Sequence, residues 1–153
     1  VSSTDSSLLA GGPVHTAIHE AAGDELRQEC EVLGGCPVGE ARITGAYKLP
    51  ARYVIHTVAP TWVDGNHGEL KILEACYLNA LRLAEARGLR TLAFPSIGSG
   101  LQPQIPLELA APVAVRTIYN FLAGHALPEK VVMVCFDSAT FKFHQHSLRE
   151  TLP

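Results

Sequence analysis

One stretch constrains the fold of this chain more than any other: residues 90–106, where a short apolar run leads into a small-residue loop and then prolines. Thr91–Phe94 has the pattern of a strand buried on both faces of a parallel sheet. Pro95 ends that strand because proline has no backbone N–H. Residues 96–100 form a small-residue loop, and Pro106 suits the first turn of a helix. A strand, a glycine loop and a helix in this order expose backbone N–H groups that can bind an anion.

The loop by itself does not identify a ligand. It lacks the Gly-Lys-Ser/Thr of a Walker loop and the G-x-G-x-x-G spacing of a dinucleotide fingerprint. An ordinary strand-to-helix turn is therefore an open alternative at this point.

Composition narrows the class of protein. A chain of 153 residues with 47% apolar residues fits one domain, residues 1–153, with a single core. The net charge of −3 offers no basic field for nucleic acid, and no apolar run is long enough to span a bilayer, so we expect neither partner. Four cysteines without a C-x-x-C pair argue against a disulfide framework and favour a reducing, intracellular compartment, cytoplasmic or nuclear.

The alternation of strands and helices predicts an α/β fold with a mainly parallel sheet. The apolar runs at 53–58, 91–94 and 131–136 are expected to be interior strands, whereas the polar residues 1–5 read as part of a loop. Another strand is expected at 41–46, and helices at 13–22, 25–33, 69–87 and 107–122 and from 138 towards 149.

Four segments match the motifs of one family, in order and at nearly constant spacing. Residues 6–19 are similar to S-S-L-L-G-G-G-G-V-D-G-A-I-H, and residues 34–44 to G-G-C-P-T-G-E-A-K-I-T. Residues 49–58 are similar to L-P-A-K-Y-V-I-H-T-V, and residues 94–100 to F-P-A-I-S-T-G. Together they resemble the macro domain, the ADP-ribose-binding module.

The resemblance implies a three-layer α/β/α sandwich with a mixed, mainly parallel central sheet, and a single macro-like domain that lacks the family's usual first strand. It also implies that ADP-ribose or an ADP-ribosylated ligand binds with its diphosphate between two glycine loops, held by backbone N–H groups. No metal or cofactor is expected. The ligand-binding residues implied are Gly11, Gly12, Val14, Ser96, Gly98, Ser99, Gly100, Leu101 and Gln102.

Departures from the family pattern bear on catalysis. Asp5 stands where hydrolytic members have an asparagine, His15 where they have an aspartate, and Gln102 where an aromatic residue covers the terminal ribose. His15 could serve as a general base, since its ordinary pKa is near neutrality, but a carboxylate such as Asp5 beside it would favour the protonated form. The other interpretation is that His15 only lines a loop. We therefore expect binding with weak or no hydrolysis; the alternative is an ADP-ribosyl hydrolase or O-acetyl-ADP-ribose deacetylase that uses His15 or water activation by the substrate.

Three further residues have chemistry that the sequence leaves without a role. His19 lies four residues after His15, on the same face of the expected helix, but the spacing predicts no third metal ligand nearby. His56 falls within an apolar strand and is expected to be a core histidine. Cys36, in a Gly-Cys-Pro turn, is expected to be structural.

Overall fold

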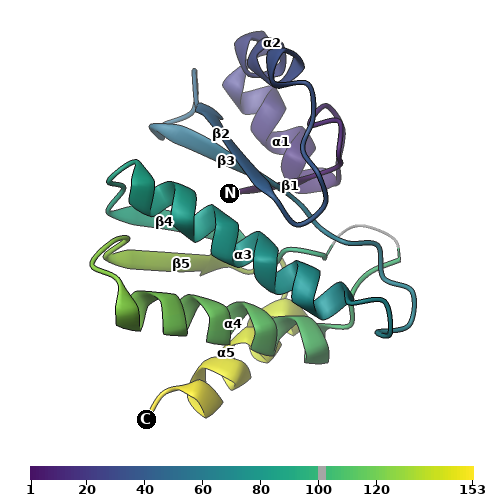
Figure 1. Ribbon diagram of the computed structural model, residues 1–153, viewed down its shortest axis with the longest axis vertical. Coiled ribbons are helices and arrows are strands. Elements are labelled where there is room, and N and C mark those ends of the chain that lie inside the picture. The colour runs from purple at the N-terminus through teal and green to yellow at the C-terminus, as the bar shows by residue number, and fades with distance from the viewer. Residues whose placement is uncertain (100–102) are drawn as a thin grey trace.

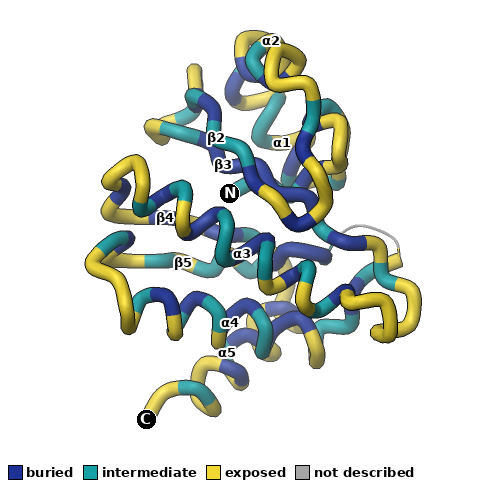
Figure 2. Tube along the Cα trace, viewed as in Figure 1, coloured by how far each residue is buried: buried dark blue, intermediate teal, exposed yellow. Residues whose placement is uncertain are grey.

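The computed structural model describes residues 1–99 and 103–153, and its strands form two short sheets (Figure 1). In the first, β3 (Tyr53–Val58) lies between β1 (Ser2–Thr4), to which it is parallel, and β2 (Ala41–Gly45), to which it is antiparallel. β3 is buried on both faces over almost its whole length, as expected for a central strand (Figure 2).

The second sheet pairs β4 (Thr91–Pro95) with β5 (Lys130–Val134) in parallel. β1 lies beside β4, and the amino group of Val1 donates a hydrogen bond to the carbonyl of Ala93 at 2.7 Å. The two sheets are thus neighbours, and the expected mixed, mainly parallel arrangement is confirmed.

Helices α3 (Glu69–Ala86) and α4 (Leu107–Gly124) cover one face of both sheets, in front of the strands in Figure 1. Their apolar residues recur at helical spacing, so one face of each helix packs on the sheet. This packing forms the larger core, which includes Ile55, Leu73, Tyr77, Leu81, Leu92, Phe94, Ile97, Ile105, Ala114 and Phe121.

Helices α1 (Pro13–Ala22) and α2 (Asp24–Leu33) pack on the three-stranded sheet from the other face and enclose a smaller core. α5 (Ser138–Thr151) packs against α4. The layers of helix, sheet and helix are those of the expected α/β/α sandwich. In the described part of the chain, no helix is both long and apolar enough to cross a membrane.

The prediction that the 91–94 strand is buried on both faces is wrong. Leu92 and Phe94 point into the larger core, whereas Thr91 and Ala93 are exposed. The 131–136 run shows the same alternation on β5, where Val132 is 44% exposed. The reason is that α1 and α2 pack on β1 and β2, so the second face of β4 and β5 has no covering helix among the described residues.

The interpretation of residues 1–5 as a loop is also wrong, because Ser2–Thr4 form a strand. Ser2 pairs with His56 and Thr4 with Val58, and both polar residues are almost fully buried. The Thr4 hydroxyl donates to the carbonyl of Ala10 at 2.8 Å, which satisfies it inside the fold. Short polar side chains gave no apolar alternation from which this strand could be predicted.

The loop between β3 and α3 is organised by one buried carboxylate, that of Glu69. Its Oε2 accepts the backbone N–H groups of Val63, Asp64 and Gly65 at 3.0, 3.1 and 3.0 Å. Its Oε1 accepts the N–H of His67 at 2.7 Å. Four donors on one carboxylate favour its ionised form and hold the loop against the start of α3.

We therefore predict that this loop loosens in acid. Burial raises the pKa of Glu69, but the hydrogen bonds from Gly65, Val63 and His67 outweigh burial and lower that pKa from 4.5 to about 2. A depressed carboxylate pKa contributes stability that is complete above the ordinary pKa and lost as pH falls through the folded one. The emission of Trp62, the single tryptophan, should therefore shift between pH 4.5 and about 2.

The matched variant is Glu69→Gln, which keeps the shape but lacks the charge and puts an NH₂ group among donors. It should show the shifted Trp62 emission already at pH 7. A parent whose emission stays constant down to pH 2, or a variant with the parent's emission at pH 7, would contradict this account.

Candidate functional site

A cavity of about 210 Å³ lies where the carboxyl ends of β4 and β5 meet the start of α1. In open α/β sheets, ligands bind at the carboxyl ends of the strands, so this is the expected place for a site. The lining residues are Ser3, Gly12, Pro13, Val14, Pro95, Ser96, Ser99, Gln104, Phe136, Asp137 and Thr140.

One wall of the cavity is a tight turn over residues 96–99. The carbonyl of Ser96 accepts two hydrogen bonds from Ser99, one from the backbone N–H at 3.2 Å and one from the side-chain hydroxyl at 2.7 Å. Gly98, at the third position, has a φ of +90°, which a type II turn requires there. Glycine suits this position of the turn because only glycine adopts this backbone conformation without strain.

The facing wall is the open N-terminus of α1. Its first internal hydrogen bond runs from the N–H of Thr16 to the carbonyl of Gly12 at 3.1 Å. The N–H groups of Val14 and His15 precede that bond, and Gly12 provides no side-chain cap. Unsatisfied N–H groups and the helix dipole make such a terminus attractive to an anion.

A third wall comes from the start of α5, and the sequence interpretation missed it. Asp137 is the N-cap, and its carboxylate accepts the backbone N–H of Thr140 at 2.8 Å. Hydrogen bonding from Thr140 lowers the pKa of Asp137. Phe136, one residue earlier, is 87% exposed and borders the cavity. Their position in the sequence was the available signal, since they come within three residues of the end of β5, as Ser96 comes directly after β4.

The predicted ligand residues divide into four groups. Gly12, Val14, Ser96 and Ser99 line the 210 Å³ cavity together. Gly98 lies in the turn beneath it, where an added Cβ would meet Ile105 Cδ1 at 2.8 Å, and Gly11 borders a different hollow. Gly100, Leu101 and Gln102 lie outside the described residues.

The two predicted catalytic residues are separate from this cavity. Asp5 is exposed, and its Oδ1 accepts the backbone N–H of Ser7 at 2.9 Å and the Ser7 hydroxyl at 2.5 Å. His15 is 4% exposed and, together with Gly11 and His19, lines a second hollow of about 430 Å³. Burial lowers the pKa of His15, against the raising effect of the Leu9 backbone and the Asp5 charge. A neutral imidazole can accept a proton, but this ring is not among the groups lining the 210 Å³ cavity.

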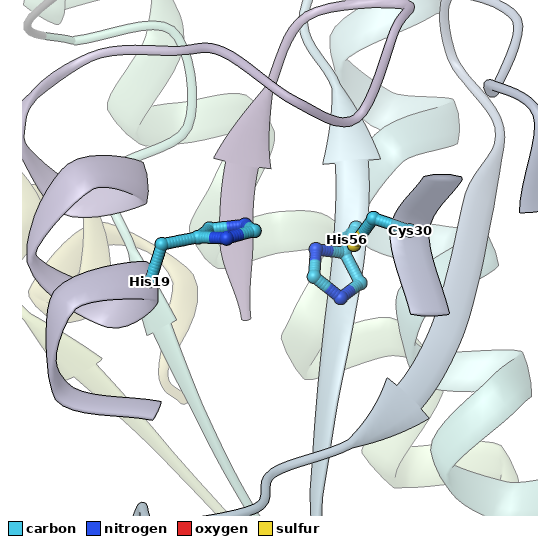
Figure 3. A group of neighbouring side chains, drawn as sticks. All are labelled: His19, Cys30 and His56. Atoms are coloured by element: carbon cyan, nitrogen blue, oxygen red, sulfur yellow. The ribbon is translucent and has the colours of Figure 1, made fainter. Parts of the chain in front are cut away.

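His15 and His19 share one face of α1, as predicted, with ring centroids 4.2 Å apart. The spacing predicts no third metal ligand near His19, yet folding brings Cys30 from α2 and His56 from β3 beside it (Figure 3). Cys30 and His56 are fully buried, so His56 is a core histidine, as expected. Cys36 is also buried.

The candidate donor atoms of His19, Cys30 and His56 all lie within 4.8 Å of one another. His56 Nε2 lies 2.8 Å from the Thr44 hydroxyl, while His19 Nε2 and His56 Nδ1 have no partner among the described residues. Burial, helped by the charge of His19, lowers the pKa of His56 to about 3, which keeps its ring neutral.

Comparisons of the sequence and of the fold with known proteins all point to one family. A family model described as Macro domain matches residues 1–114. A macro domain-containing protein of Chlorobaculum tepidum is 47% identical over 97% of this chain and 86% of its own length. An O-acetyl-ADP-ribose deacetylase of Escherichia fergusonii is 45% identical over 98% of this chain and 86% of its own. The Oceanobacillus iheyensis macrodomain solved with ADP has a TM-score of 0.90 and 35% identity, covering 97% of this chain and 80% of that one.

The chain therefore belongs to the macro domain family, and the resemblance inferred from the four segments is confirmed.

The 96–99 turn yields a prediction about Gly98. Alanine at a φ of +90° costs about 1–2 kcal/mol of backbone strain. Its Cβ would also approach Cδ1 of the buried Ile105, so Gly98→Ala should lose about 1 kcal/mol more of unfolding free energy than the matched Gly34→Ala. Gly34 has a φ of +75° but nothing within 4 Å of an added Cβ. Urea unfolding measures both; equal losses would show that Ile105 does not restrict the turn.

Proposed function

We propose that this chain binds ADP-ribose or an ADP-ribosylated ligand in the 210 Å³ cavity, with weak or no hydrolysis. The observation that carries the proposal is the meeting of two features at one cavity: the open N-terminus of α1 and the 96–99 turn on facing walls, with an exposed aromatic ring beside them.

The diphosphate is assigned to the space between α1 and the turn. The N–H groups of the first turn of α1 lie on one side, and on the other side the Ser96 hydroxyl has no hydrogen-bond partner among the described residues and can donate. The lining contains no lysine or arginine among the described residues, so recognition there would rest on backbone dipoles. This agrees with a chain whose net charge is −3.

The nucleoside is assigned to the α5 wall. Phe136 offers an exposed ring on which a planar base can stack. The carboxylate of Asp137 would repel phosphate but can accept a hydrogen bond from a ribose hydroxyl. The two ends of the cavity therefore differ in hydrogen bonding. The donors at α1 suit the anionic part of the ligand, and the acceptor at α5 suits its sugar.

Among relatives, the Trypanosoma brucei macrodomain was also solved with ADP, at 34% identity and a TM-score of 0.88. Some relatives are named O-acetyl-ADP-ribose deacetylases. In this chain the Asp5 carboxylate accepts hydrogen bonds from Ser7, and His15 lines another hollow. Neither residue is therefore placed to support efficient hydrolysis of a ligand in the 210 Å³ cavity. Hydrolysis by His15 or by the substrate's own phosphate is the alternative.

Calorimetry with ADP-ribose, ADP and AMP tests the binding proposal. We expect micromolar or tighter affinity for ADP-ribose. Phe136→Ala should weaken ADP-ribose and AMP alike, by about tenfold, because both carry the base that would lose its stacking partner. Phe141→Ala is the matched control, since Phe141 is 53% exposed on α5 and does not border the cavity.

Parent affinity no better than millimolar, worth only about 4 kcal/mol, would reject the binding proposal. Equal effects of Phe136→Ala and Phe141→Ala would reject the assignment of the base to Phe136.

Turnover of O-acetyl-ADP-ribose, assayed beside a deacetylase relative, tests the catalytic part. We expect a rate at least about a hundredfold lower, the loss that follows removal of general-base assistance. The opposing hypothesis forecasts activity that rises with pH through a histidine pKa lying below 6.5, because burial lowers the pKa of His15 and only the neutral ring accepts a proton. That activity would disappear in His15→Ala while ADP-ribose binding remained. Robust turnover with that profile would overturn the proposal, and robust turnover indifferent to His15 would place water activation elsewhere.

A further inference from the structure

The 96–99 turn is tied to α3 by one buried side chain, Tyr77. The phenol oxygen of Tyr77 accepts the backbone N–H of Ile97 at 2.9 Å. Tyr77 and Ile97 are each 1% exposed, and the Tyr77 ring packs on Phe94 with centroids 5.0 Å apart. The hydrogen bond therefore lies in the larger core, shielded from water, where an unpaired N–H is costly.

This bond matters because it settles which N–H groups of the turn are already used. Tyr77 takes the N–H of Ile97, and the Ser96 carbonyl takes that of Ser99. Within the described residues, the N–H of Gly98 has no partner. Gly98 is also the residue with the left-handed backbone, so a turn of another type would orient the peptide between Ile97 and Gly98 differently.

We propose that Tyr77 is a positioning residue of the binding site. Gly98 is buried and does not line the cavity, so by fixing the Ile97 N–H from beneath, Tyr77 holds the turn in the form that places Ser96 and Ser99 on the cavity wall. Tyr77 itself does not line the cavity, so it acts only through the turn. This role rests on the proposed function, since the anion that uses the turn is the diphosphate of ADP-ribose.

The direct test is Tyr77→Phe, which removes one hydroxyl and keeps the ring against Phe94. ADP-ribose and ADP should both bind about tenfold more weakly, by the same factor, because they share the diphosphate. Backbone amide exchange, followed by NMR, should show the Ile97 N–H exchanging faster in the variant. The matched control is Tyr119→Phe on α4, where the hydroxyl makes no hydrogen bond among the described residues; its affinity and Ile97 exchange should equal the parent's.

A role in stability alone would lower the melting temperature of Tyr77→Phe but leave the dissociation constants unchanged at a temperature where both proteins are folded, and that result would overturn the proposal. If the parent binds no ADP-ribose, the proposed function fails separately, and Ile97 exchange unchanged by Tyr77→Phe would then reject the Tyr77 role as well. Fast exchange of the Ile97 N–H in the parent would reject it without any variant.

Discussion

The site depends on one constraint of direction: β4 and β5 run parallel, so both end at the same edge of the sheet. The segment that follows β4 becomes the 96–99 turn, and the segment that follows β5 carries Phe136 and Asp137 into α5. Although about forty residues apart in sequence, they border one cavity. β1 lies beside β4 and adds the third segment, because the chain leaves β1 at that edge and returns as α1.

Two helices begin at this cavity, and their N-termini differ in electrostatic character. α1 starts without a side-chain cap, so its first N–H groups are free for an external anion. α5 starts with Asp137, whose carboxylate already satisfies the N–H of Thr140. An anion is therefore favoured at α1 and disfavoured at α5. If the proposed function holds, this difference would orient an asymmetric ligand such as a nucleoside diphosphate, with no basic side chain among the described residues that line the cavity.

The histidines occupy a different environment, below the first turn of α1. The rings of His15 and His19 lie close together and tilted relative to each other, and the His19 ring is near that of the buried His56. Burial lowers the pKa of each of the three, so these rings are held neutral together. Neutral rings can pack closely without charge repulsion, which suits a group that joins α1 to β3. The same α1 thus presents N–H groups to the cavity at its start and histidines to the core along its inner face.

Sequence by itself determined the family, the order of most elements and a small-residue loop after the 91–94 strand, because these depend on local chemistry: apolar periodicity, proline and glycine. It did not determine the strand at Ser2–Thr4, whose polar side chains become buried only by pairing with β3. It overstated the burial of Thr91 and Val132, since coverage of a sheet face depends on where distant helices pack. Tertiary structure alone decided that Phe136 joins Ser96 at the cavity, that His15 lies elsewhere, and that Cys30 meets His19 and His56. Those contacts join residues far apart along the chain, and the directions of strands and helices that create them are set by packing, which no short sequence pattern contains.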